Sequence, residues 1–249
     1  MKPKIFIDAG HNHSLFNTGA SGNGMREQDI SFEVGFLLAQ RLAPDFDVTL
    51  SRPTLTTNLG QDNSSAINAR WQMANERRAD AFISLHVNAG GGTGVETFFF
   101  RECSERSRRS QELAEQVNTL FAHEMKLRNR GVKADTQTAV GSIGVLRRTN
   151  MPAILVELAF IDSPAVNPDV AILRNKRAEM ADAIAKGVYQ YFGVPETGGT
   201  VKFDILGRIV HVDGYISPDG VTWVRARNII EAMGYRVDWN VKERAVMVV

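Results

Sequence analysis

Apolar residues follow two different periods along residues 4–193. Short apolar runs predict buried strands at 4–8, 47–50, 81–86, 94–100, 142–146 and 153–157. Between these runs apolar residues recur at helical spacing, which predicts helices over 30–42 (with Asp29 as the N-cap), 64–78, 104–126 and 170–192. Alternation of this kind predicts an α/β fold, in which helices cover both faces of a mainly parallel sheet.

The composition changes at residues 195–200, Pro-Glu-Thr-Gly-Gly-Thr, which is typical of a linker. We therefore expect a main domain over 1–194, this linker over 195–200, and a small C-terminal α+β module over 201–249. Within the module the pattern predicts strands at 202–205, 208–212, 235–239 and 245–249, a turn at 217–220 and a helix at 225–233. A module of roughly 50 residues has little core of its own, so we expect it to pack on the main domain, on a copy of itself or on a partner.

The bulk composition excludes several classes of protein. Of the 249 residues 43% are hydrophobic, which is ample for a core, and the formal net charge of +1 gives no reason to expect nucleic acid as a partner. The arginines between 101 and 109 alternate with glutamates, so we interpret them as a solvated helix face. Cys103 is the one cysteine. It allows neither a disulfide within the chain nor a cysteine-based zinc site, and we interpret it as an incidental thiol.

Three of the predicted strands lead to residue types that bind metals or transfer protons. His11 follows the first strand through a small Ala-Gly pair, His86 ends the strand 81–86, and Glu157 ends the strand 153–157. Two histidines and a carboxylate at the ends of three buried strands suggest one shared site. Zinc is the natural candidate for it.

The third zinc ligand has two candidates in the sequence. Zinc in a hydrolase takes about three protein ligands and keeps one position open for water. Glu27 follows the glycine-rich loop 18–24, whereas His13 lies two residues after His11. We favour Glu27, because the chain has to turn away after residue 12. Glu33 falls among the apolar positions of the first predicted helix and is interpreted as a helix-face residue.

Glu157 has a functional and a structural interpretation. A carboxylate at the end of a valine-rich strand is costly to bury unless it is paired or useful. Beside a metal it could take a proton from zinc-bound water and pass it to a leaving nitrogen. The alternative is a salt bridge with Arg147 or Arg148. The other two histidines, His123 and His211, are interpreted as ordinary surface or packing residues.

Several motifs occur in the order that a known enzyme family shows. They are Asp8-Ala9-Gly10-His11, Glu27 before Asp29-Ile30-Ser31-Phe32, Arg70 with Ala74-Asn75, the run 79–89, Gly94-Val95-Glu96-Thr97, Val145-Leu146-Arg147 and the run 151–161. Over residues 4–193 the chain resembles the zinc-dependent N-acetylmuramoyl-L-alanine amidases of the Amidase_3 type. Asn12 and Ala159 depart from it, since the family usually has glycine at both positions, which affects loop shape and substrate fit.

The resemblance implies a function and a role for each site residue. His11, Glu27 and His86 would hold zinc, and Glu157 would be the catalytic carboxylate. The chain would then be a peptidoglycan hydrolase that cuts the amide between N-acetylmuramic acid and the L-alanine of the stem peptide by zinc-activated water. The alternatives are a zinc peptidase or deacetylase acting on another cell-wall amide, and a non-catalytic wall-binding protein.

The C-terminal module resembles a second family more loosely. The segments 210–214, 220–224 and 232–235 are similar to the copper amine oxidase N-terminal-like domain, although no cluster of ligands in the module would hold copper. The resemblance implies a module that holds the enzyme on the cell wall. A homodimer through this module is the other expectation.

The beginning of the chain gives an expectation about localisation. The first predicted strand starts at Lys4, which leaves no room for a signal peptide, and no run of about 18 apolar residues could span a membrane. We therefore expect synthesis in the cytoplasm without a signal peptide and action on the cell wall after release. A phage or prophage endolysin, or a mother-cell lysin, fits this expectation. The polar stretch 128–142 is either part of the substrate groove or an ordinary loop.

Overall fold

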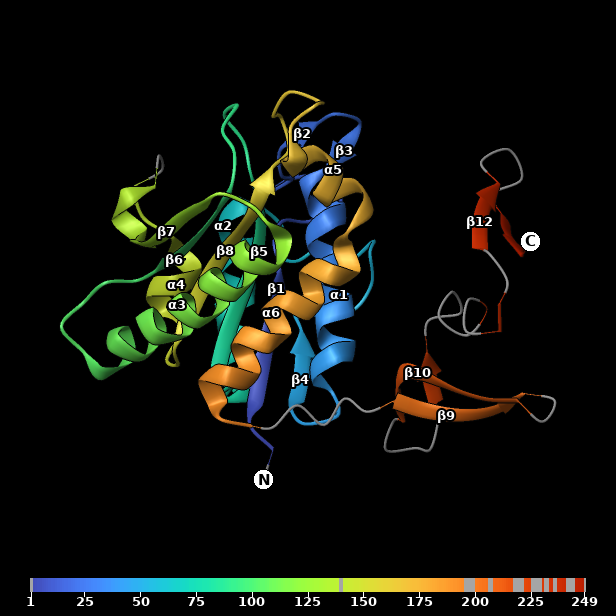
Figure 1. Ribbon diagram of the computed structural model, residues 1–249. Coiled ribbons are helices and arrows are strands. Elements are labelled where there is room, and N and C mark those ends of the chain that lie inside the picture. The colour runs from blue at the N-terminus through green and yellow to red at the C-terminus, as the bar shows by residue number, and fades with distance from the viewer. Residues whose placement is uncertain are drawn as a thin grey trace. The chain divides into compact units, whose positions relative to one another are not determined.

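The chain consists of two compact units, Met1–Glu196 and Thr197–Val249. This computed structural model describes residues 2–138 and 141–194 and, in the second unit, 200–205, 208–216, 222–224, 230, 233–234, 237–240 and 245–248. In the first unit helices surround a central sheet (Figure 1).

The sheet of the first unit has six strands in the order β4-β1-β5-β8-β6-β7. They are β1 (Lys4–Ala9), β4 (Asp47–Leu50), β5 (Ala81–Asn88), β6 (Val95–Phe99), β7 (Asn129–Ala134) and β8 (Ala153–Phe160). Every neighbouring pair is parallel except β6 and β8, which are antiparallel. The predicted mainly parallel α/β sheet is therefore confirmed.

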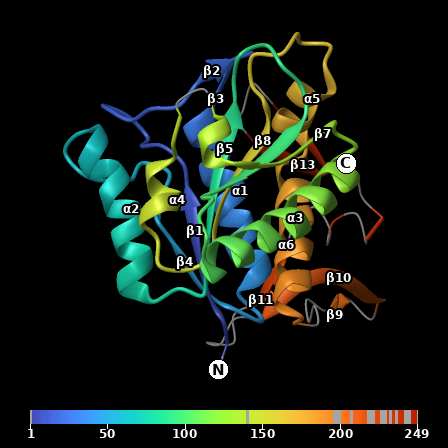
Figure 2. The same ribbon diagram turned by 90° about the vertical axis from the view of Figure 1, so that its left-hand side faces the viewer.

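Helices cover both faces of this sheet (Figure 2). The helices α1 (Glu27–Leu42), α3 (Glu105–Met125), α5 (Pro168–Asn175) and α6 (Arg177–Phe192) contribute to the larger apolar core on one face. The helices α2 (Asn63–Arg77) and α4 (Gly144–Arg148) contribute to the smaller core on the other face. Successive side chains of a strand point to opposite faces, so Ile5 and Ile7 of β1 join the larger core and Phe6 joins the smaller one.

Two helix predictions need correction. The first helix begins at Glu27, and its N-cap is Arg26, not Asp29. Asp29 instead pairs with Arg26, with 2.7 Å between Oδ2 and Nε. The helix predicted over 170–192 is two helices, α5 and α6, which are separated at Lys176. Both halves bury apolar residues against the same core, so the hydrophobic pattern continues across the break.

The strand predicted at 142–146 is wrong, because this segment forms α4, in which the adjacent residues Val145 and Leu146 are both buried. The outermost strand of the sheet, next to β6, is instead β7, which lies within the stretch 128–142. Among the described strands, β7 pairs only with β6. An edge strand of sequence Asn-Arg-Gly-Val-Lys-Ala lacks the apolar run that marks a central strand.

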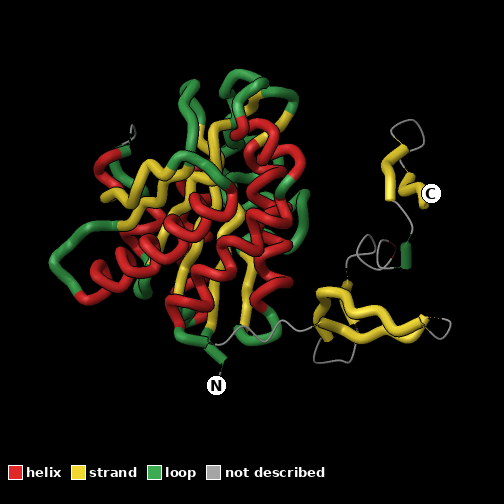
Figure 3. The backbone as a smooth tube through the Cα atoms, viewed as in Figure 1, coloured by secondary structure: helices red, strands yellow, loops and turns green. Residues whose placement is uncertain are grey.

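The second unit contains short strands (Figure 3). β9 (Thr200–Ile205), β10 (Arg208–Ile216) and β11 (Thr222–Val224) form an antiparallel sheet, and β12 (Val237–Asn240) pairs with β13 (Ala245–Val248). The strands expected in this region coincide largely with β9, β10, β12 and β13, and β11 was not expected. The expected turn at 217–220 and most of the helix at 225–233 lie outside the described residues. Across the described parts of both units, no helix combines the length and the apolar character needed to cross a membrane.

Candidate active site

The candidate site lies at the end of the sheet toward which the C-termini of β1, β5 and β8 point. In the register of the sheet His86 of β5 is opposite Glu157 of β8, and Glu157 is opposite Glu96 of β6. Because β6 is antiparallel to β8, its first residues reach the edge where β8 ends. Three polar side chains from adjacent strands therefore form one row.

His11 occupies a strained turn directly after β1. Its φ of +64° lies in the left-handed region, which a residue with a side chain adopts at a cost. Two buried arginines hold this turn: Arg70 Nη2 donates to the His11 carbonyl at 2.5 Å and Arg52 Nη1 donates to it at 3.3 Å. Gly10 is required here as well, because a Cβ at that position would lie 2.5 Å from His86 Nε2.

Glu27 enters the site from the first turn of α1. A short hairpin of β2 (Ser21–Gly22) and β3 (Met25–Arg26) precedes it. The side chain is buried, and it accepts hydrogen bonds from the Ala20 amide at 2.8 Å and from the Val87 amide at 3.0 Å. Burial alone would raise the pKa of Glu27, but the hydrogen bonds with His11 and His86 outweigh it and hold the pKa far below its usual value. Glu27 is therefore an ionised carboxylate with a fixed orientation.

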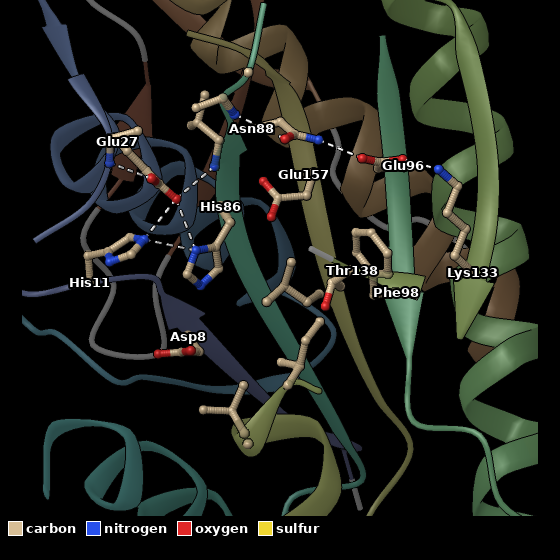
Figure 4. Close-up of a pocket in the computed structure, with 18 of the residues that line it drawn as sticks. Asp8, His11, Glu27, His86, Asn88, Glu96, Phe98, Lys133, Thr138 and Glu157 are labelled. Carbon is tan, nitrogen blue, oxygen red and sulfur yellow. Dashed lines mark hydrogen bonds and ion pairs between the residues drawn. The ribbon is translucent and has the colours of Figure 1, made fainter. Parts of the chain in front are cut away.

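The three predicted metal ligands lie together (Figure 4). Glu27 Oε1 is 2.9 Å from both His11 Nε2 and His86 Nδ1, and the two nitrogens are 3.1 Å apart. His13, the alternative third ligand, is not part of this cluster. Within the part of the chain that the structure describes, no other group of histidine, cysteine and acidic side chains comes this close together.

The chemistry of these three atoms fits a cation better than hydrogen bonds alone. If both imidazoles donated to Glu27 Oε1, two N–H groups would converge on one oxygen with their nitrogens 3.1 Å apart, and their hydrogens would repel each other. A metal ion removes this conflict, since each nitrogen then offers a lone pair. Tetrahedral zinc with bonds of 2.0–2.1 Å separates its ligand atoms by about 3.3 Å, close to the separations in the cluster.

Glu157 has one carboxylate oxygen without a hydrogen-bond partner among the described residues. Its side chain is half-buried, and among the described residues Oε2 is shielded from solvent and has no hydrogen-bond partner. The alternative salt bridge is absent: Arg147 pairs with Asp135 at 2.9 Å, and Arg148 Nη1 donates to Asn68 at 2.6 Å. Burial, together with the charges of nearby carboxylates, raises the pKa of Glu157 well above its usual value.

Glu96 is a site residue that the sequence reasoning quoted in a motif but did not assign to the site. It is buried, accepts from Asn88 Nδ2 at 2.6 Å and from Arg130 Nε at 3.0 Å, and also contacts Lys133 Nζ. Burial alone would raise the pKa of Glu96, but Lys133 and Arg130 hold it below its usual value. The sequence contains a signal for this role, because Glu96 is a carboxylate inside the apolar run 94–100. A carboxylate is costly to bury unless it is paired or useful, which is the argument that selected Glu157.

A groove of about 910 Å³ joins these groups. His11, Glu27, His86 and Glu157 line it, and so do five residues of the polar stretch 128–142, namely Arg130, Lys133, Gln137, Thr138 and Ser142. The stretch therefore lines this groove, which agrees with one of its two interpretations, and a role in substrate binding stays a prediction. A groove of this size accommodates an extended ligand around the cluster and Glu157.

Comparison with known proteins identifies the family. The sequence profile of the Amidase_3 family, N-acetylmuramoyl-L-alanine amidase, matches residues 5–190. The chain belongs to this family. It is 29% identical to the endolysin of Bacillus phage SPP1 over 99% of this chain and 85% of that protein. It is also 29% identical to the sporulation-specific N-acetylmuramoyl-L-alanine amidase of Bacillus subtilis, over 81% of this chain and 73% of that protein.

Solved amidase structures share the fold. The N-acetylmuramoyl-L-alanine amidase of Clostridium difficile 630 superposes with a TM-score of 0.64 at 26% identity, covering 78% of this chain and 98% of that one. The catalytic domain of CwlV, the amidase of Bacillus (Paenibacillus) polymyxa, gives the same TM-score of 0.64 at 26% identity, covering 77% and 99%.

The other candidates of the first unit, Cys103, His123 and Glu33, do not line the groove of the amidase. Cys103 and His123 are exposed, and the side chain of His211 lies outside the described residues. The arginine-rich segment is a paired helix face, as interpreted, because Arg106 contacts Glu102 and Arg108 contacts two glutamates of its own helix. Glu33 is on the face of α1 and contacts Arg177 of α6.

Proposed function

We propose that the amidase is a zinc-dependent peptidoglycan hydrolase, which cuts the amide between N-acetylmuramic acid and the L-alanine of the stem peptide. The observation that carries the zinc site is the convergence of one atom each from His11, Glu27 and His86. Family membership supports the bond that is cut. Glu157, in the same groove, supports hydrolysis over binding alone.

His11, Glu27 and His86 would hold the metal. When bound, zinc supplies a Lewis acid that polarises the amide carbonyl and lowers the pKa of a water molecule. The chain contributes two imidazoles and one carboxylate, and the amides of Ala20 and Val87 orient that carboxylate. Such fixed outer contacts keep a ligand in place before the metal arrives.

Glu157 would transfer the proton. It takes a proton from the attacking water and then donates it to the departing nitrogen of L-alanine. Its raised pKa suits a group that has to accept and release a proton. Glu96 is unsuited to this role, because both of its oxygens already accept hydrogen bonds and its pKa is lowered.

Digestion of purified peptidoglycan tests the proposal directly. We expect mass spectrometry to find free stem peptides with an L-alanine amino terminus when zinc is present, and none after chelation. Peptides with cut crosslinks instead would identify a zinc endopeptidase. Equal digestion after chelation would reject the metal, and a lack of any product would indicate a wall-binding protein.

We also propose that the amidase acts as a phage or prophage endolysin after its release from the cytoplasm. Its similarity to the SPP1 endolysin supports this setting, because the match includes nearly the whole chain. The similarity to the sporulation-specific amidase favours a mother-cell lysin as the second candidate. The C-terminal unit, which we relate to the copper amine oxidase N-terminal-like domain, would hold the enzyme on the wall.

Sedimentation with purified cell walls tests the C-terminal unit. The full-length Glu157→Gln variant, which should leave the walls intact, is compared with the same variant ending at residue 196. We expect the shorter protein to lose most of its wall-bound fraction. Equal retention of both proteins, with a dimer of the longer one in analytical ultracentrifugation, would replace wall binding by dimerisation.

A further inference from the structure

The far wall of the groove carries two cations that the proposed proton transfer does not use. Arg130 and Lys133 lie on β7, and both line the groove that contains the three predicted metal ligands. Their side chains keep 28% and 27% of their exposure. Figure 4 shows Lys133 on the far side of Glu96 from the cluster of His11, Glu27 and His86.

Glu96 holds both cations in place but leaves a net positive charge. Its Oε2 accepts from Arg130 Nε at 3.0 Å and also contacts Lys133 Nζ, while its Oε1 accepts from Asn88. One carboxylate therefore faces two cations. The guanidinium of Arg130 also lies over the ring of Phe160, with Cζ 4.9 Å from the ring centroid, a contact that stabilises its position.

Both cations keep hydrogen-bond donors for a ligand. An ammonium has three N–H donors, and among the described residues Glu96 is the one hydrogen-bond partner of Lys133 Nζ. Arg130 uses Nε for Glu96 and Nη1 for the Thr93 carbonyl at 3.5 Å, and within the same residues Nη2 donates to no protein acceptor. The wall thus presents oriented, partly desolvated donors to an anion.

The place of this wall selects one part of the substrate. Glu96, which binds both cations, is the register neighbour of Glu157. The backbones of the two glutamates are therefore separated by one strand spacing, roughly 4.8 Å. The cations should meet substrate atoms one or two residues from the scissile amide. In peptidoglycan the acid of the muramic lactyl group is consumed in that amide, so the free acids belong to the stem peptide.

We propose that Arg130 and Lys133 form an anion subsite that binds the free α-carboxylate of the γ-linked D-glutamate, the second residue of the stem peptide. This inference rests on the proposed amidase function. It gives the enzyme a preference for stem peptides whose second residue is an acid over those in which this carboxylate is an amide.

Two synthetic muramoyl tripeptides that differ only in this group, acid or amide, test the subsite. We expect kcat/KM of the wild-type protein to be about tenfold higher for the acid, the scale of a hydrogen bond to a charged group at a partly exposed site. Lys133→Met should bring the acid substrate down toward the amide substrate, chiefly through KM. Arg130→Gln should act in the same direction, and Lys133→Arg should keep the preference.

Lys176→Gln is the matched control. It removes an exposed cation between α5 and α6, outside the groove, and should keep the wild-type preference. Zinc content and thermal melting show which variants are folded, and the Arg130 and Lys133 substitutions each test the subsite if the other fails to fold.

A second readout separates this inference from the proposed function. Binding of the intact acid and amide substrates to zinc-loaded Glu157→Gln protein is measured by calorimetry, with and without Lys133→Met. Cleavage of both substrates at equal rates would overturn the subsite and leave the amidase standing. A binding preference that Lys133→Met abolishes, without any cleavage by the wild-type protein, would support the subsite and overturn the proposed function.

Discussion

Glu157→Gln is expected to remove nearly all turnover while zinc stays bound. Glutamine has almost the same shape but cannot accept a proton, and general acid–base catalysis contributes roughly 10²–10⁴-fold to a rate. We therefore expect kcat on purified peptidoglycan to fall at least about 10²-fold. Zinc content should be unchanged, because Glu157 is not among the three converging ligand atoms.

Glu33→Gln is the control for this substitution. Glu33 has the same side chain and lies on α1, where it contacts Arg177 instead of lining the groove. It should keep wild-type turnover. Wild-type activity in Glu157→Gln would assign the proton transfer to another group. Loss of zinc from this variant would mean that the substitution damages the proposed zinc site.

The melting temperature of Glu157→Gln is a second test of the buried carboxylate. Burial and neighbouring negative charges raise the pKa of Glu157, so the folded protein binds this proton more tightly than the unfolded chain does. Ionisation then costs stability: the cost is absent below the ordinary pKa of 4.5 and complete above the raised one. Metal-free Glu157→Gln should therefore melt at a higher temperature than the wild type at pH 8, and at the same temperature near pH 4.

The fold was predictable where burial leaves a strong pattern. β1, β5 and β8 are covered on both faces, so they appear in the sequence as continuous apolar runs. β7 has a polar sequence and one neighbour among the described strands, and its pairing with β6 depends on a contact that is distant along the chain. The segment 142–146 carries an apolar run of strand length, and periodicity alone does not separate such a run from a short helix.

The candidate site was predictable at the strand ends and not across the sheet. His11 follows the buried strand β1, and His86 and Glu157 lie in the second halves of β5 and β8, which continue to Asn88 and Phe160. Their meeting therefore needs only parallel neighbours. Glu96 starts its strand, and it reaches the same edge because β6 is antiparallel to β8. No local feature of the sequence gives this direction, and the cations of β7 depend on it in turn. Glu27 was favoured over His13 because the chain was expected to turn away after residue 12. The structure contains a turn at this place, where φ of His11 is +64°.

Arg70→Leu is expected to cost the protein roughly 3–5 kcal/mol of unfolding free energy. Arg70 of α2 is 2% exposed, and its Nη1 lies 2.5 Å from Asp8 Oδ1 and 2.7 Å from the Ala9 carbonyl. Burial alone would raise the pKa of Asp8, but Arg70 holds it below its usual value. Leucine would leave the buried carboxylate of Asp8 without its counter-ion and the Ala9 carbonyl without the donor on Arg70.

Urea denaturation with Arg77→Leu as the control measures this cost. Arg77 lies at the end of the same helix and pairs with Asp47, but the two side chains are 42% and 40% exposed. An exposed pair of this kind contributes at most about 1 kcal/mol. The two variants remove the same group from one helix, so the difference between them isolates burial. Similar losses in both would contradict the account of Asp8 and Arg70.

The Arg70 substitution should also weaken the proposed zinc site in protein that remains folded. Arg70 Nη2 donates to the His11 carbonyl at 2.5 Å, in the turn where φ of His11 is +64°. Without this donor the turn can relax toward ordinary backbone angles, and the imidazole of His11 then leaves its place beside Glu27. Competition with a chelator below the onset of unfolding should show weaker zinc binding in Arg70→Leu than in Arg77→Leu. Equal zinc affinity in the two variants would mean that Arg70 stabilises the fold but does not position His11 for zinc binding.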